Sequence, residues 1–148
     1  MTTWMDFQGP GFTLTVPSDW LIQASQTVQA AFLSPDRGQP FRANLVITLR
    51  PVQPDVTATV VAAAASESQL QEYPQYTIQV ETSAKAGAIE GFYRRYRWFN
   101  VQENLAVLQS QSFFVHQQVL FTLTATCLTD DHSEIPSILK RMIDTFML

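Results

Sequence analysis

The sequence predicts an α+β fold in which a mostly antiparallel sheet of about six to seven strands is flanked by helices. Two stretches, 41–50 and 119–127, alternate between apolar and polar residues over most of their length, which is typical of antiparallel strands with one buried face. The third observation is a C-terminal series of apolar residues at helical spacing, formed by Ile135, Ile138, Leu139, Met142, Ile143 and Phe146.

The 148-residue chain has the length of one ordinary domain, and we expect residues 1–148 to form a single domain. Hydrophobic residues make up 46% of the sequence and charged residues 15%, whereas disordered chains are rich in charge and poor in apolar side chains. The composition therefore predicts a folded globular protein with one sizeable core.

Three strands are expected before the first helix. The segment "GFTLTVPSDW" alternates until Pro17 stops the ladder, and a second strand is expected at about 28–33. The clearest strand is "FRANLVITLR", residues 41–50, which ends at Pro51.

A helix is expected between Pro54 and about Tyr73, with Asp55 as its N-cap. It is rich in alanine, and its larger apolar residues lie on a roughly common side, which predicts a buried stripe made of Val56, Val60, Ala63 and Leu70.

Four strands and a second helix are expected after Pro74. The first is the strand "YTIQVETSAK", and Gly87 forms the turn that leads to the next strand at 90–100. Two further strands, joined by a tight turn near 116–118, fill the next segment. The last strand places Cys127 on its apolar face, where we expect a buried structural thiol. Asp131 or Ser133 can cap the final helix, so the acidic segment "DDHSE" is interpreted as a helix start and not as a metal site.

The stretch "EGFYRRYRWFN", residues 90–100, is dense in aromatic and basic side chains. Strand alternation puts Phe92, Arg94, Tyr96 and Trp98 on one face and the neighbouring residues on the other. In the simplest interpretation the rings pack in the core, while the arginine stems cross apolar surface with their heads in water. The alternative is a partner-binding patch, since exposed Arg and Tyr are typical of interfaces; its predicted contact residues are Tyr93, Arg95, Arg97 and Phe99.

Several functions are disfavoured by the sequence. The net charge of −4 opposes binding to nucleic acid, and Glu90 stands where a ribonucleoprotein-type strand would carry a basic residue. No catalytic residue, metal or cofactor is predicted, because His116 has no nucleophile motif around it and no zinc or phosphate-loop spacing occurs. We therefore expect a protein that is not an enzyme.

The N-terminus has no basic region followed by an apolar run, and the most apolar stretch, "VTATVVAAAASES", is shorter than the roughly 18–20 residues that span a bilayer. A cytoplasmic protein without stable membrane insertion is therefore expected.

The succession of "GFTLTVPSDW", "GFYRRYRWF", "LAVLQSQSFFVHQQVLFTLTATC" and "ILKRMIDTFML" resembles the PsbP-like superfamily, which includes the Ran-binding import factors of the Mog type and the bacterial DcrB-like proteins. Its landmarks are Pro17 followed by Trp20, the aromatic Tyr96 and Trp98, and Phe146 in the last helix. The resemblance implies an α/β/α sandwich with an accessory or binding role. The chain is also similar in length to the Eag-type chaperones of type VI secretion, which shield hydrophobic helices of effectors.

Three functions follow as hypotheses. The first is a noncatalytic, chaperone-like module that binds another protein or a hydrophobic peptide segment, such as part of a secreted effector, with a homodimer as one arrangement. The second is a small-molecule binding protein or enzyme that uses a pocket on the sheet, with Arg94 or Arg97 holding an anionic ligand. The third, RNA binding, would require retention on RNA that weakens steeply with salt.

Overall fold

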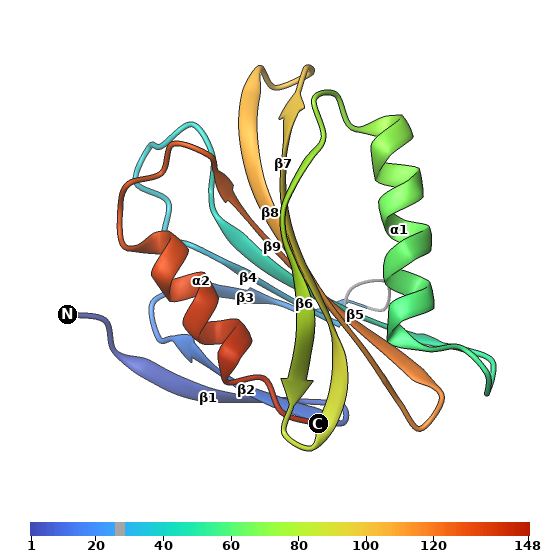
Figure 1. Cartoon of the computed structure of the whole chain (residues 1–148). Helices are drawn as coiled ribbons and strands as arrows, with labels where there is room; N and C mark the ends of the chain where they lie inside the picture. Colours follow the sequence, from blue (N-terminus) through green and yellow to red (C-terminus); the bar gives the residue numbers. More distant parts are fainter. Residues whose placement is uncertain (26–28) are drawn as a thin grey trace.

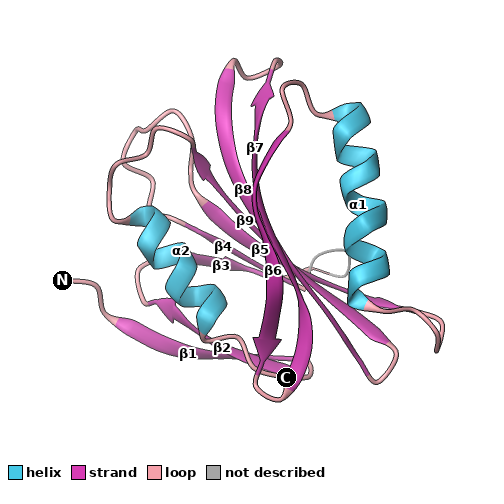
Figure 2. Ribbon diagram, in the orientation of Figure 1, coloured by secondary structure: helices cyan, strands magenta, loops and turns pink. Residues whose placement is uncertain are grey.

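A twisted antiparallel sheet runs through the centre of the molecule, with one helix on each face (Figures 1 and 2). The computed structural model describes residues 1–25 and 29–148, and within them seven strands pair in the order β3-β4-β5-β9-β8-β7-β6. The strands are β3 (Leu21–Gln23), β4 (Ala30–Leu33), β5 (Asn44–Pro51), β6 (Thr77–Ala86), β7 (Ile89–Asn100), β8 (Leu105–His116) and β9 (Val119–Leu128). The predicted α+β class is confirmed.

The N-terminal part contains more strands than the sequence predicts. β1 (Trp4–Gly9) and β2 (Phe12–Pro17) form a separate hairpin, and the short β3 follows it. Neither β1 nor β3 alternates regularly, which explains why the pattern missed them. The strand expected at about 28–33 is β4, and its first expected residue, Val28, lies outside the described residues.

The main core lies between the sheet and the layer formed by α2 (Ile135–Asp144) and the β1–β2 hairpin (Figure 1). The predicted apolar series of α2 fills it, because Ile138, Leu139 and Met142 are buried and Phe146 is buried just after the helix ends. The chain end is tied to β2 by a pair of backbone hydrogen bonds between Thr13 and Met147, of 3.0 and 2.8 Å.

The opposite face of the sheet is covered by α1 (Ala58–Glu72), whose predicted orientation is wrong. Its buried residues are Ala58, Ala62 and Gln69, whereas Val60 and Leu70 of the expected stripe are 61% and 68% exposed. Ala63 is also exposed and Val56 is only half-buried. The small side chains of Ala58 and Ala62 pack on Phe113 and Leu120 of the sheet. On the same face, Gln69 of α1 bonds to Gln111, and the Ala62 carbonyl accepts from Arg94.

The cap of α1 also differs from the prediction. The side chain of Thr57, and not that of Asp55, accepts a 3.2 Å hydrogen bond from the Val60 amide. In α2 the N-cap residue is Glu134, which makes no side-chain capping hydrogen bond, so neither Asp131 nor Ser133 occupies the predicted cap position. Ser133 lies one residue earlier, and its hydroxyl accepts from the Ile135 amide at 3.1 Å. Asp131 in turn accepts from the amide of Ser133 at 2.9 Å, which orders the turn before the helix.

Two glycines determine how β7 meets its neighbours. Gly87 has a φ of 65° and forms the turn between β6 and β7, as predicted. At Gly91 a side chain would collide with the carbonyl oxygen of Phe113 and the ring of Phe114 on β8. The glycine at the start of the aromatic stretch therefore permits close packing of the sheet.

Candidate functional site

The two faces of β7 separate as the alternation predicts. Phe92, Arg94 and Tyr96 lie beneath α1, where Phe92 packs in the small cluster around Ala62 and Phe113. The residues in between face the α2 side: Tyr93 pairs with Ser112 of β8, and Arg95 pairs with Ser110. The stretch is thus a strand between two different environments.

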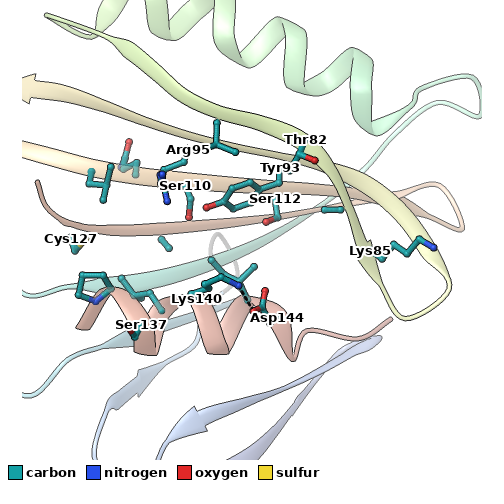
Figure 3. A pocket seen from close by; sticks show the side chains of 18 of the residues that line it. Thr82, Lys85, Tyr93, Arg95, Ser110, Ser112, Cys127, Ser137, Lys140 and Asp144 are labelled. Carbon is teal, nitrogen blue, oxygen red and sulfur yellow. Dashed lines mark hydrogen bonds and ion pairs between the residues drawn. The ribbon is translucent and has the colours of Figure 1, made fainter. Parts of the chain in front are cut away.

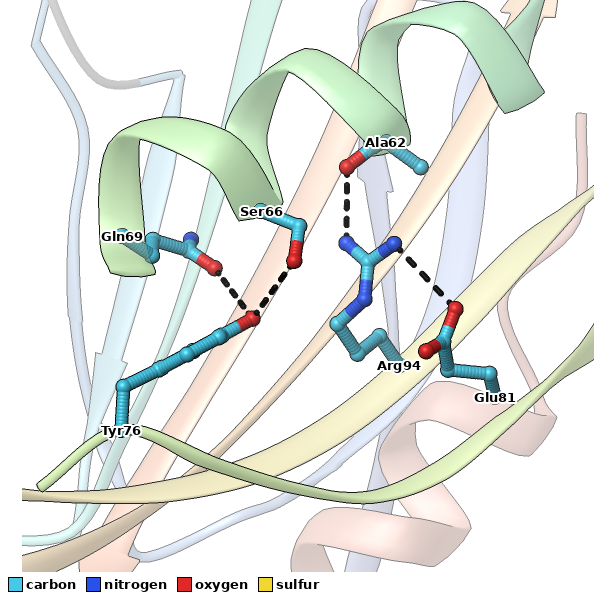
Figure 4. Close-up of polar contacts among 6 residues, drawn as sticks. All are labelled: Ala62, Ser66, Gln69, Tyr76, Glu81 and Arg94. Atoms are coloured by element: carbon cyan, nitrogen blue, oxygen red, sulfur yellow. Dashed lines mark hydrogen bonds and ion pairs between the residues drawn. The ribbon is translucent and has the colours of Figure 1, made fainter. Parts of the chain in front are cut away.

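Arg94 corrects the expectation that the arginine heads lie in water. The residue is 3% exposed, and its guanidinium donates to the backbone oxygen of Ala62 at 2.8 Å and to the Glu81 carboxylate at 3.5 Å (Figure 4). The buried Nε has no partner within the described chain. Arg94 therefore links α1 to the sheet, and its guanidinium is not available to bind a ligand.

A buried polar network continues along the same face (Figure 4). Gln69 of α1 donates to the Gln111 side chain at 2.7 Å and to the Tyr96 hydroxyl at 3.3 Å, and it accepts from the Tyr76 hydroxyl at 3.1 Å. Burial strongly raises the pKa of Tyr96, which keeps this phenol neutral. Because these groups satisfy one another, we assign the network a structural role.

The other face carries a groove between α2 and the β6–β9 half of the sheet, here called the α2 groove (Figure 3). It has a volume of about 730 Å³. Its apolar lining consists of Val80, Ala84, Leu108, Phe114, Ala125, Pro136, Leu139 and Ile143. The outermost strand of its wall, β6, pairs with β7 and is the edge strand of the sheet, so one edge of β6 has no strand neighbour within the described residues.

Hydrogen-bond donors are concentrated in the same groove (Figure 3). Tyr93 and Arg95 reach it from β7, Ser110 and Ser112 from β8, and Lys140 from α2. The Arg95 Nε donates to Gln79 at 3.1 Å, and no contact within the described chain uses its two terminal nitrogens. Ser112 is 1% exposed, and its hydroxyl has no partner within the described chain.

The groove is electropositive although the protein is acidic. The cations Lys85, Arg95 and Lys140 line it with a single acid, Asp144, in a chain of net charge −4. Lys140 donates to Asp144 at 2.6 Å, and this hydrogen bond and the nearby negative charge raise the pKa of Lys140. The phenol of Tyr93 also acts on the Lys140 pKa, which is consistent with their positions on opposite walls.

The sequence pointed to only the β7 part of this arrangement. Of the four predicted contact residues, Tyr93 and Arg95 line the groove, while Arg97 and Phe99 lie farther along β7 and are outside its lining. The groove residues of β8 and α2 were missed. They carried no local signal, because the groove forms only when segments far apart in the sequence meet.

Catalytic groups do not converge in the α2 groove. Cys127 lines it, but burial and then the charge of Asp131 raise the pKa of the thiol to about 11, so the nucleophilic thiolate is scarce at neutral pH. Across residues 1–25 and 29–148, the structure has no cluster of three or more His, Cys, Asp or Glu side chains suited to a metal ion.

Within the described residues, this architecture is an α+β fold with a seven-stranded antiparallel sheet between two helices and a groove under the C-terminal helix. The sequence model of the DcrB family matches residues 12–145, and the chain therefore belongs to the DcrB family. No match was found among curated protein sequences.

Solved structures show the same fold at low sequence identity. LpqN of Mycobacterium tuberculosis, described as involved in cell envelope biogenesis, superposes with a TM-score of 0.74 at 16% identity over 99% of this chain and 90% of its own. The cyanobacterial PsbP of Synechocystis sp. PCC 6803 gives 0.70 at 16% identity, covering 100% of this chain and 94% of its own. A putative regulator, PA94 of Pseudomonas aeruginosa, gives 0.69 at 17%, covering 96% and 94%. The predicted PsbP-like and DcrB-like relationship is confirmed.

Neither of the two helices in the described residues is long and apolar enough to cross a bilayer.

Proposed function

We propose that this protein is a noncatalytic accessory module that holds an apolar segment of another polypeptide in the α2 groove. The observation that carries the proposal is the groove itself, where apolar side chains from the sheet and the helix form a continuous lining beside the edge strand β6. Burying one Val- or Leu-sized side chain there would contribute about 1.5–3 kcal/mol to binding.

Membership of the DcrB family and the PsbP-type fold support an accessory role. The role is chaperone-like, because the groove shields apolar side chains that a partner would otherwise expose to water. A secreted effector is one partner of this kind. The cytoplasmic location expected from the sequence stays a prediction.

A peptide-display selection tests the proposal. Random 12-residue peptides selected on the intact protein should be enriched in apolar residues, and their affinities can be measured by fluorescence anisotropy. Val80→Glu places a carboxylate among the apolar side chains of the groove, directly opposite Arg95 on β7, and should weaken binding at least about tenfold, because the new charge removes apolar contact area and occupies the Arg95 guanidinium.

The matched control is Val60→Glu, on the outer face of α1, where the side chain is 61% exposed. It should leave peptide affinity unchanged. The proposal fails if the selection yields no peptides, or if Val60→Glu abolishes binding while Val80→Glu retains it.

A further inference from the structure

The α2 groove has more hydrogen-bond donors than its own acceptors can satisfy. Its donors include the Arg95 guanidinium, the ammonium groups of Lys85 and Lys140, and the hydroxyls of Tyr93, Ser110 and Ser112. Asp144 is its one carboxylate, and it is already bonded to Lys140 at 2.6 Å. A bound anionic group with several acceptor oxygens would satisfy the unused hydrogen-bond donors of the groove.

The donors are also placed to converge. On the sheet, Tyr93 lies directly opposite Ser112 and Arg95 directly opposite Ser110, so two neighbouring cross-strand pairs bring all four to one patch. Lys140 faces the patch from α2 (Figure 3). Arg95 is held by Gln79 through Nε, which leaves its terminal nitrogens for a planar, two-oxygen acceptor.

Ser112 adds an independent observation. Buried hydroxyls are nearly always hydrogen-bonded, yet this one, in a residue that is 1% exposed, has no partner in the described chain. An unpartnered buried hydroxyl in the lining of a groove calls for an explanation, and a ligand seated in the groove is one that fits the neighbouring donors.

We infer that the segment held in the α2 groove carries a carboxylate, from an acidic side chain or a C-terminus, which binds between Arg95 and Lys140 beside the hydroxyls of Tyr93 and Ser110. This inference rests on the proposed function and specifies the partner: an apolar segment with one acidic group. Neighbouring apolar side chains of that segment occupy the part of the groove lined by Leu108, Phe114 and Ile143.

The sequence suggested Arg94 or Arg97 as the arginine that binds an anion, whereas this inference gives that role to Arg95. Arg94 is buried beneath α1 and bonded to Ala62 and Glu81, and Arg97 is outside the groove lining. Arg95, which lies between them on the chain, is the arginine that reaches the groove.

The test uses one selected peptide in two forms that differ only by Glu→Gln at its acidic position. The intact protein should bind the Glu form about tenfold more tightly than the Gln form at low salt, and the preference should shrink as salt is added. Arg95→Gln should reduce the preference to less than about twofold. Arg97→Gln, on the same strand face but outside the groove, should leave it intact.

Each other outcome has a defined meaning. Selected peptides that lack acidic residues and bind equally well when their C-terminus is amidated would overturn this inference and leave the proposed function standing. A Glu preference that survives Arg95→Gln would have the same meaning. A selection that yields no peptides overturns both. Thermal stabilisation by free octanoate that depends on Arg95, without peptide binding, would show that the ligand is a small organic acid and would also overturn the inference.

Discussion

Arg94 and Arg95 are adjacent in the sequence and have opposite roles. Strand alternation correctly predicted that their side chains point to different faces. It could not predict that Arg94 is buried, because the acceptor that permits this is a backbone oxygen in the middle of α1, contributed by a residue 32 positions away. The sequence shows that a side chain is charged, but it does not show which group of a distant segment will bond to that side chain.

Replacing Ser112 measures how much the unpaired hydroxyl in the α2 groove lowers the free energy of unfolding. Replacing it with alanine removes a buried polar group that has no hydrogen bond, and a group of this kind costs about 1–3 kcal/mol. We expect Ser112→Ala to raise the free energy of unfolding by about 1 kcal/mol, measured by urea denaturation. A loss of more than about 1 kcal/mol would show that the hydroxyl has a stabilising partner.

Cys127 should behave as a protected thiol. Burial and the charge of Asp131 raise its pKa from 9.0 to about 11, which lowers the thiolate fraction at pH 8 about 100-fold. Iodoacetamide should therefore react with the native protein at least about 100-fold more slowly than with the urea-unfolded chain. Equal rates would contradict the burial of this thiol.

The raised pKa of Cys127 also determines how the free energy of unfolding changes with pH. The folded state holds the thiol proton more tightly than the unfolded state, so the contribution of Cys127 to stability is complete below pH 9 and is lost as the pH rises toward about 11. Cys127→Ala should therefore show a smaller loss of stability than the native protein across this range.

At the scale of elements, the buried face was predicted correctly where a segment has one regular apolar face, and the errors fell on segments without such a face. The strands 41–50 and 119–127 and the helix α2 each bury a regular apolar set, and their period shows in the sequence. β1 and β3 have no such set. The helix α1 was recognised, but its rotation was wrong, because it buries alanines and a glutamine while valine and leucine face solvent.

The corrected rotation of α1 can be tested with two neighbouring alanines. Ala62 is fully buried against the sheet, and Ala63 is exposed. Ala62→Leu should overpack the interface and lower the free energy of unfolding by about 1–3 kcal/mol. Ala63→Leu should change it by less than about 0.5 kcal/mol, and equal effects in urea denaturation would contradict the observed orientation.

At the scale of the whole molecule, the groove is a product of topology. Its walls come from β6, β7, β8, β9 and α2, and only the β7 part was suggested by the sequence, through its density of aromatic and basic residues. The solved structures share the fold at 16–17% identity, so the fold persists while most of the sequence changes. Under the proposed function, the side chains of the α2 groove would select the partner.

A second hollow of about 740 Å³ lies between the end of β5 and the outer side of α1, lined in part by Val56, Val60 and Ala64. It is the alternative place for an apolar segment, but it lacks the donors that converge in the α2 groove. The two positions lie on opposite faces of the sheet, so a binding experiment can separate them.

Hydrogen exchange of the intact protein with and without a selected peptide tests the central claim most directly. If the peptide binds in the α2 groove, amide exchange should become slower in β6, β7 and α2 and stay unchanged in α1. Slower exchange confined to α1 and the end of β5 would place the partner on the opposite face and contradict the account.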